Sequence, residues 1–149
     1  MSVIIVAGPT CAGKSTFIKQ NFPDRTVIDI YDFQQNCLIN PDTILESYEA
    51  CKVALQDALR SGKKVVLEHT LLCQKRRPMY IDAIREITDE DIEMFFIIPT
   101  ISEHMRRARQ RNIKLTVDYV RYMHEIAEIP TTIEGYSNVH IIRDTAATI

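Results

Sequence analysis

The feature that most constrains the fold of this chain is a glycine-rich octapeptide close to its amino end. It reads Gly8-Pro9-Thr10-Cys11-Ala12-Gly13-Lys14-Ser15 and matches the pattern G-x-x-x-x-G-K-[ST] in full. An apolar run at residues 3–7 precedes it, and a helix-forming stretch at residues 14–21 continues from it. Strand, glycine loop and helix in this order predict a loop whose backbone amides surround a phosphate group.

Each part of this octapeptide suits phosphate binding. Gly13 permits the tight turn, and the helix that begins near Lys14 directs the positive end of its dipole at the ligand. We expect Lys14 to reach the β- and γ-phosphates of a nucleotide, and Ser15 to offer its hydroxyl to Mg²⁺. Residues 8–16, ending at Thr16, therefore predict a site for ATP with Mg²⁺. The sequence has no N-K-x-D run that would read guanine, but the choice between ATP and GTP stays open.

The rest of the chain alternates apolar runs with segments of helical periodicity. Strands are predicted at residues 3–7, 26–29, 65–67, 92–98 and 139–142. Helices are predicted at residues 14–21, from 42 or 43 to about 61, from 77 to about 87, at 102–111 and from 116 to about 128. Buried strands separated by helices are typical of a parallel sheet covered on both faces. We expect a three-layer α/β fold of the P-loop NTPase and kinase type with a five-stranded parallel sheet.

Length and composition limit the number of domains and the kinds of partner that we expect. A length of 149 residues suits one domain, so we expect a single domain over residues 1–149. The longest apolar runs are too short to span a bilayer, so no membrane partner is expected. A net charge of −2 argues against a surface that binds nucleic acid throughout. Oligomeric state is left open.

The cysteines point to a reducing compartment. None of the four forms a C-x-x-C pair, and no histidine stands at zinc-finger spacing. We therefore expect reduced thiols in a cytoplasmic protein, with Cys51 on the apolar face of a helix and Cys11 as a small residue within the glycine loop. The four positions are Cys11, Cys37, Cys51 and Cys73.

Four further stretches, at residues 28–35, 68–77, 98–111 and 129–136, resemble the polynucleotide-kinase-like branch of the P-loop kinases. The resemblance extends over most of the chain. It implies that an aspartate after the second strand deprotonates the acceptor hydroxyl, and that lid arginines four residues apart hold the transferring phosphoryl group. Carried over, it makes Asp32 the candidate general base and Asp29 the rival, since Asp29 ends the strand and could hold metal-bound water. The family's arginine three residues after its base is replaced here by Gln35.

The resemblance also places acceptor contacts after the third strand. Glu68 falls where P-loop enzymes keep a carboxylate near the metal, and His69 falls where the resembling kinases more often have an aspartate. Either residue could contact the acceptor or metal-bound water, and Thr70 could add a hydroxyl. The basic cluster at residues 75–77 opposes the dipole of a helix that it begins. Either an acceptor phosphate bound there, with Arg77 as the contact, or solvent exposure would make this charge tolerable.

A basic segment follows the fourth strand. Residues 104–114 contain four arginines, one lysine and no acid, a local charge of +5. Arg107 and Arg111 share a helix face at a spacing of four, and Arg106 lies beside them. Arginines that close over a transferring phosphoryl group lower the barrier to transfer. We therefore expect a basic lid at about residues 102–115.

Together these features predict an ATP- and Mg²⁺-dependent kinase that transfers the γ-phosphate to a hydroxyl. The resemblance favours the 5′-hydroxyl of a polynucleotide as the acceptor. The alternatives are a small metabolite, a nucleoside or an antibiotic, favoured by Gln35 and by the scarcity of aromatic residues for base stacking. A protein of a different class, a nucleotide-binding regulator that transfers nothing, is the further alternative.

Overall fold

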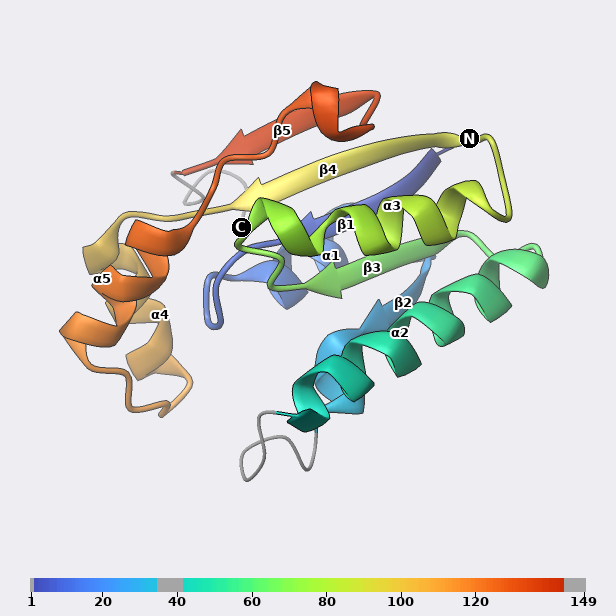
Figure 1. Cartoon of the computed structure of the whole chain (residues 1–149). Coiled ribbons are helices and arrows are strands. Elements are labelled where there is room, and N and C mark those ends of the chain that lie inside the picture. Colours follow the sequence, from blue (N-terminus) through green and yellow to red (C-terminus); the bar gives the residue numbers. More distant parts are fainter. Residues whose placement is uncertain (1, 35–41, 144–149) are drawn as a thin grey trace.

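The computed structural model describes residues 2–34 and 42–143. Its centre is a sheet of five parallel strands in the order β2-β3-β1-β4-β5 (Figure 1). The strands are β1 (Ser2–Ala7), β2 (Thr26–Asp29), β3 (Val65–His69), β4 (Asp91–Ile97) and β5 (Asn138–Ile142). All five strands were predicted from apolar runs, and the prediction of a three-layer α/β fold is confirmed.

Five α-helices connect the strands, each within a few residues of its predicted bounds. They are α1 (Lys14–Asn21), α2 (Asp42–Arg60), α3 (Pro78–Arg85), α4 (Ile101–Gln110) and α5 (Val117–Ile126). Thr116 caps α5, and its side chain accepts a hydrogen bond from the backbone amide of Tyr119. Three short 3₁₀ helices were not predicted: η1 (Ile30–Phe33), η2 (Gln74–Arg76) and η3 (Thr132–Glu134).

The sheet has a hydrophobic core on each face because successive strand residues point in opposite directions. In β1, Val3, Ile5 and Ala7 join the larger core beneath α2 and α3, which includes the fully buried Cys51. Ile4 and Val6 join a smaller core with Phe17 and Ile18 of α1. Figure 1 shows α2 and α3 over one face of the sheet and α1 behind the other. Cys51 was predicted in the core, and this prediction is confirmed.

The loops that follow the strands meet at the carboxyl edge of the sheet. The strand order reverses at β1, which has β3 on one side and β4 on the other, and such reversals open a crevice where ligands bind. Asp29 of β2 is in register with Glu68 of β3, which is in register with Val6 of β1. Helices α4 and α5 lie beyond the end of β4 (Figure 1). The phosphate loop, Asp29 and Glu68 therefore lie at one edge of the sheet.

Among the residues that the structure describes, no helix is both long and apolar enough to cross a membrane. The described cysteines, Cys11, Cys51 and Cys73, are free thiols. Cys37 lies outside the described residues.

Candidate functional site

The phosphate loop, residues 8–15, depends on glycine at two positions. Gly8 lies against the end of β4, where a Cβ atom would come within 2.2 Å of the carbonyl oxygen of Ile97. Its amide donates to the carbonyl of Thr70 at 3.0 Å, which ties the loop to the end of β3. Gly13, with φ of 103°, precedes the first residue of α1, and no side chain caps this helix end. The first-turn amides of α1 are therefore available to an anion.

Side chains hold the carbonyl groups of this loop. The ammonium of Lys14 donates to the carbonyls of Gly8 at 2.6 Å and Pro9 at 3.1 Å. The next carbonyls are held from α4: His104 Nε2 lies 2.6 Å from the Thr10 oxygen, and Arg107 donates to the Ala12 oxygen. In a trans peptide the amide hydrogen points opposite to the carbonyl of the same plane. Fixing the carbonyls therefore fixes the directions of the amides that follow them.

Lys14 is buried within this loop, at 7% exposure. Burial lowers its pKa to about 8, and the nearby carboxylates of Glu68 and Asp29 partly oppose that shift. A buried cation whose hydrogen-bond partners are neutral carbonyls gains from the approach of an anion. The position of Lys14 therefore suits a ligand with several phosphate groups.

Ser15 and Glu68 join α1 to β3 at the predicted metal position. The Ser15 hydroxyl donates to Glu68 Oε2 at 2.7 Å. Burial raises the pKa of Glu68, and the hydrogen bond from Ser15 and the neighbouring Lys14 oppose the rise. Within residues 2–34 and 42–143 no group of three or more His, Cys, Asp or Glu side chains could enclose a metal ion. One hydroxyl beside a carboxylate fits Mg²⁺, which keeps several waters and takes its other ligands from phosphate.

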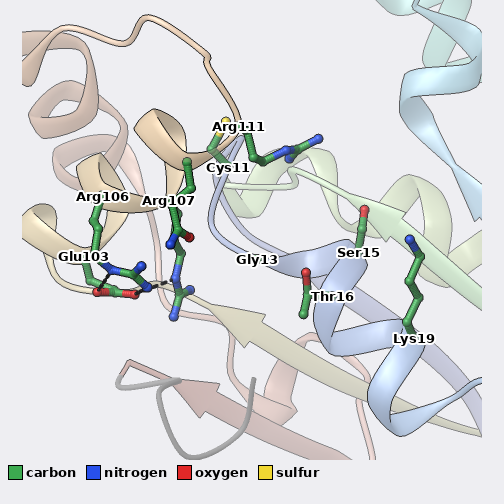
Figure 2. Close-up of a pocket in the computed structure, with 10 residues that line it drawn as sticks. Cys11, Gly13, Ser15, Thr16, Lys19, Glu103, Arg106, Arg107 and Arg111 are labelled. Atoms are coloured by element: carbon green, nitrogen blue, oxygen red, sulfur yellow. Dashed lines mark hydrogen bonds and ion pairs between the residues drawn. The ribbon is translucent and has the colours of Figure 1, made fainter.

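Two cavities adjoin the phosphate loop. The larger, of about 490 Å³, lies between α1 and α4 (Figure 2). The smaller, of about 270 Å³, lies on the side of β2 and β3, where Lys14, Asp29, Tyr31 and Glu68 contribute to its wall. Residues that line both cavities are Cys11, Gly13, Ser15 and Arg111. A group bound at the loop would therefore be accessible to one ligand in the larger cavity and to another in the smaller cavity.

The three candidate arginines of α4 have different surroundings. Glu103, one residue outside the acid-free segment, binds both Arg106 and Arg107, and this lowers its pKa to about 2. Arg107 is buried between Glu103 and the Ala12 carbonyl. Figure 2 shows Arg111 extending away from these two arginines, toward the side of α1 that carries Ser15. Arg111 lines both cavities, and its charge partly opposes the rise that burial causes in the pKa of the nearby Glu68 carboxyl.

The two candidate bases also differ in position. Asp29 lines the smaller cavity and accepts a hydrogen bond from the Tyr31 amide at 3.0 Å. Burial raises the pKa of Asp29, and the nearby Asp32 adds to the rise. Asp32 is exposed on η1 and is not among the residues that line the cavity. Gln35 lies outside the described residues.

His69 is a structural residue, contrary to the expectation that it contacts an acceptor. It is fully buried at the end of β3, and burial lowers its pKa to about 3. Its Nε2 lies 2.9 Å from the Tyr80 hydroxyl, and its Nδ1 accepts from the Thr70 amide at 2.8 Å. Thr70 is half-buried and binds the loop through its backbone carbonyl, as described above. His69 thus supports the phosphate loop through Thr70 and has no access to a ligand.

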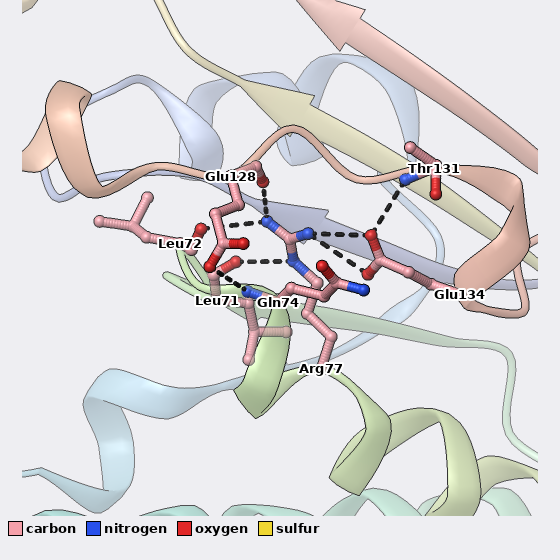
Figure 3. Close-up of polar contacts among 7 residues, drawn as sticks. All are labelled: Leu71, Leu72, Gln74, Arg77, Glu128, Thr131 and Glu134. Carbon is pink, nitrogen blue, oxygen red and sulfur yellow. Dashed lines mark hydrogen bonds and ion pairs between the residues drawn. The ribbon is translucent and has the colours of Figure 1, made fainter.

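Arg77 fits neither of the two alternatives given above, an acceptor contact or exposure to solvent. Its side chain is fully buried and donates to the carbonyls of Leu71, Leu72 and Glu128 (Figure 3). Its remaining donors face Glu134, at 3.1 and 3.3 Å. Every nitrogen of the guanidinium is used within the protein. Arg77 joins the loop after β3 to the segment before β5.

Sequence analysis missed His104, which contacts the phosphate loop, and also Tyr31 and Glu103, which line the cavities. His104 lies 94 positions from Thr10, and its neighbour in space, His124, comes from α5. The only sequence signal is that His104 and the buried Ala108 share one face of α4 at a spacing of four. That spacing places His104 toward the interior but does not identify its partner.

No family model matches the chain. Among solved structures, a sugar kinase from Janibacter sp. HTCC2649 is 11% identical, with a TM-score of 0.69 over 97% of this chain and 87% of that chain. A gluconokinase from Sinorhizobium meliloti 1021 is 17% identical, with a TM-score of 0.67 over 95% and 82% of the two chains. A chain of the Pnkp1/Rnl/Hen1 RNA repair complex is 16% identical, with a TM-score of 0.65 over 85% of this chain and 46% of that chain. With the phosphate loop and the parallel sheet, these similarities show that the chain has the P-loop kinase fold.

Proposed function

We propose that the protein is a kinase that transfers the γ-phosphate of ATP to the hydroxyl group of a second substrate. The observation that carries this proposal is the common wall of the two cavities, where Gly13, Ser15 and Arg111 face both. Phosphoryl transfer needs a donor and an acceptor in line on either side of the moving group. A single cavity beside the phosphate loop would suffice for a protein that only binds nucleotide.

The larger cavity is proposed as the donor site. We propose that the amides of Gly13 to Thr16 bind the phosphates at this cavity, and that the ammonium of Lys14, which lines the smaller cavity, reaches them from the other side of the loop. Arg111 is proposed to stabilise the charge that spreads over the γ-phosphate oxygens during transfer. Arg106 and Arg107 line the same cavity but are engaged with Glu103, so we assign them to holding α4 and the loop in place.

Mg²⁺ is proposed as the metal that accompanies ATP. Ser15 would hold it, and Glu68 would bind one of its waters. When bound, the ion neutralises phosphate charge and fixes the geometry of the donor.

The smaller cavity is proposed as the acceptor site, with Asp29 as the general base. Asp29 lines this cavity beside Lys14, whereas Asp32, favoured by the family resemblance, does not line it. A carboxylate at that position can accept the proton as the hydroxyl attacks. Its raised pKa moves it toward the proton affinity that such a role needs.

We infer that the acceptor is a small molecule without phosphate groups. Among the residues that the structure describes, the cations that line the smaller cavity are Lys14 and Arg111, and both are proposed to serve the donor. Arg77, the residue expected to bind an acceptor phosphate, is occupied within the protein. A sugar, a nucleoside or a similar polyol has the hydroxyl and the lack of charge that this cavity suits.

A polynucleotide 5′-hydroxyl is the second candidate. It is supported by the resemblance described above and by Tyr31, which lines the smaller cavity and is 56% exposed. Bases stack on exposed aromatic rings of this kind. For either acceptor we propose that residues 1–149 form one kinase domain. The segment at about 102–115 would lie over the donor. We propose that the protein works in the cytoplasm, where ATP and reduced thiols are abundant.

Two assays with the purified full chain test the proposal. The first measures ATP consumption with Mg²⁺ across a panel of sugars, nucleosides and other alcohols. The second measures transfer of labelled phosphate to a 5′-hydroxyl oligonucleotide. Lys14→Met is the control, because it removes the ammonium with little change in volume.

The expected result is transfer to a small alcohol that Lys14→Met abolishes. Transfer to the oligonucleotide alone would replace the first candidate acceptor with the second. Tight ATP binding without transfer to any acceptor would favour the nucleotide-binding regulator.

A further inference from the structure

His104 connects three parts of the protein that are distant in sequence. Its side chain is fully buried in α4. On one side its Nε2 lies 2.6 Å from the carbonyl oxygen of Thr10 in the phosphate loop. On the other side its Nδ1 lies 3.0 Å from Nε2 of His124 in α5. The donor and catalytic roles proposed above make no use of either histidine.

The two hydrogen bonds determine where the protons of this pair lie. A carbonyl oxygen only accepts, so His104 must carry a proton on Nε2. In a neutral ring Nδ1 is then an acceptor, and His124 must donate from its own Nε2. The charged groups that face the pair are cations: Lys14 of α1, Arg107 of α4 and Arg143 after β5. Burial lowers the pKa of both histidines. The hydrogen bond to Thr10 partly opposes this shift in His104, and the nearby cations add to it, so both rings are neutral at pH 7.

The Thr10 carbonyl belongs to the peptide plane that also carries the amide of Cys11. The described residues contain no cis peptide bond, so this amide points away from His104. Cys11 has φ of 66°, a left-handed conformation that costs a non-glycine residue roughly 1 kcal/mol or more. Such a conformation persists when neighbouring groups hold it. The Ala12 amide donates to the Pro9 carbonyl at 3.1 Å and closes the turn around this plane. The hydrogen bond from His104 holds the carbonyl of the plane itself.

We propose that His104 is a positioning residue of the phosphate loop: it fixes the peptide plane between Thr10 and Cys11 and so aims the Cys11 amide at the phosphates of the donor. His124 fixes the tautomer that this requires. The identity of the donor rests on the proposed function, whereas the positioning of the loop does not.

Three substitutions at position 104 separate the two hydrogen bonds. Glutamine places an amide nitrogen near the position of Nε2 and can still donate to Thr10. Asparagine places its amide near Nδ1 and can reach only the side of His124. Phenylalanine keeps the ring and removes both hydrogen bonds. His140→Gln, on the exposed edge strand β5, is the matched control.

The first measurement is amide hydrogen exchange at residues 8–13 without nucleotide, with thermal unfolding as the check on the fold. We expect His104→Asn and His104→Phe to speed exchange at Ala12 by roughly tenfold, the effect of losing one buried hydrogen bond, while His104→Gln stays near the wild type. The Ala12 amide reports on this plane because it donates to the Pro9 carbonyl at 3.1 Å and so closes the turn around Thr10 and Cys11. The second measurement is calorimetric binding of MgATP, where the same two variants are expected to raise Kd by roughly tenfold. The third is ¹⁵N NMR of the imidazoles, which should show His104 and His124 protonated on Nε2.

Each possible result either supports or contradicts the positioning role of His104. If asparagine and glutamine at position 104 act alike, or if His104 is protonated on Nδ1, the positioning role is wrong. If wild-type protein binds no MgATP, the proposed function fails, and hydrogen exchange at Ala12 still decides whether His104 holds the loop. His124→Phe is the second route should a position-104 variant not fold, because it should release the tautomer and speed the same exchange. Unchanged exchange in His124→Phe would contradict the assigned role of His124.

Discussion

Arg77 Nη1 lies 3.1 Å from Glu134 Oε2, in an ion pair whose side chains are 0% and 6% exposed. Glu134 also accepts from the Thr131 amide at 3.1 Å, which closes the capping box of η3. The guanidinium lies over the ring of Phe96 in β4, 5.4 Å from its centroid. This pair joins the loop after β3, the sheet and the segment before β5.

Removing Arg77 is expected to destabilise the whole fold. Arg77→Ala would leave the Glu134 carboxylate and three carbonyl groups buried without their donor. Loss of one partner of a buried ion pair costs about 3–5 kcal/mol. Urea denaturation should show a loss of this size, with Arg76→Ala, an exposed neighbour, near the wild type. A stable Arg77→Ala protein with weakened acceptor binding would instead restore the acceptor role expected from its sequence position.

Gly8→Ala is expected to distort the phosphate loop. The new Cβ would lie 2.2 Å from the Ile97 carbonyl oxygen, a backbone atom of the sheet that cannot move aside. Gly62→Ala is the matched control, because Gly62 also has positive φ (75°) but has nothing within 4 Å of a new Cβ. Overpacking adds about 1–3 kcal/mol to the cost of substitution. Thermal unfolding should place Gly8→Ala below Gly62→Ala by that difference, and equal losses would contradict the steric explanation.

Asp29→Asn is expected to lower kcat by about 10²- to 10⁴-fold, the usual contribution of a general base. Asp32→Asn should cost much less, because Asp32 does not line the acceptor cavity. Steady-state kinetics with the acceptor found by the screen, together with MgATP affinity, separate the two carboxylates. The assignment of the base moves to Asp32 if its variant is the slower one. Full activity in both variants would leave the proposed acceptor site without a base.

Acid is expected to destabilise the fold in part through His104. Its folded-state pKa is lowered from 6.5, first by burial. The stability linked to it is therefore complete above pH 6.5 and decreases as the pH falls from 6.5 through the lower folded value. One histidine contributes a slope of at most about 1.4 kcal/mol per pH unit. Urea denaturation between pH 7.5 and 5 should show a shallower decline in His104→Gln than in wild type or His140→Gln, and parallel curves would exclude this contribution.

The fold could be predicted from the sequence because its signals are local. Short apolar runs between helical segments indicated all five strands. The runs without alternation in β1 and β3 correspond to central strands that are buried on both faces. The phosphate-loop pattern and the helix behind it are contiguous, so α1 was predicted with its observed bounds. The 3₁₀ helix η1 was missed, because three or four residues show no clear periodicity.

The residues whose roles were wrongly predicted are those whose surroundings depend on contacts between distant segments. The sequence does not distinguish the three basic residues at 75–77. Of these, only Arg77 is buried, where it binds Glu134, 57 residues away in the chain. The basic segment of α4 contains no acid over residues 104–114, yet Glu103 at its border engages two of its arginines. The sequence position of His69 suggests a ligand contact, but in the structure its ring packs against the ring of Tyr80. Which polar residue is buried is set by tertiary packing, which a single sequence does not display.

The carbonyl groups of Gly8, Pro9, Thr10 and Ala12 have hydrogen-bond partners within the protein itself. Their peptide planes are consequently oriented before any anion arrives. The loss of conformational entropy that accompanies this ordering occurs when the chain folds, not when a ligand binds. A short peptide with the same octapeptide sequence would bear that loss at the moment of binding, so it should hold phosphate far more weakly than the folded protein does.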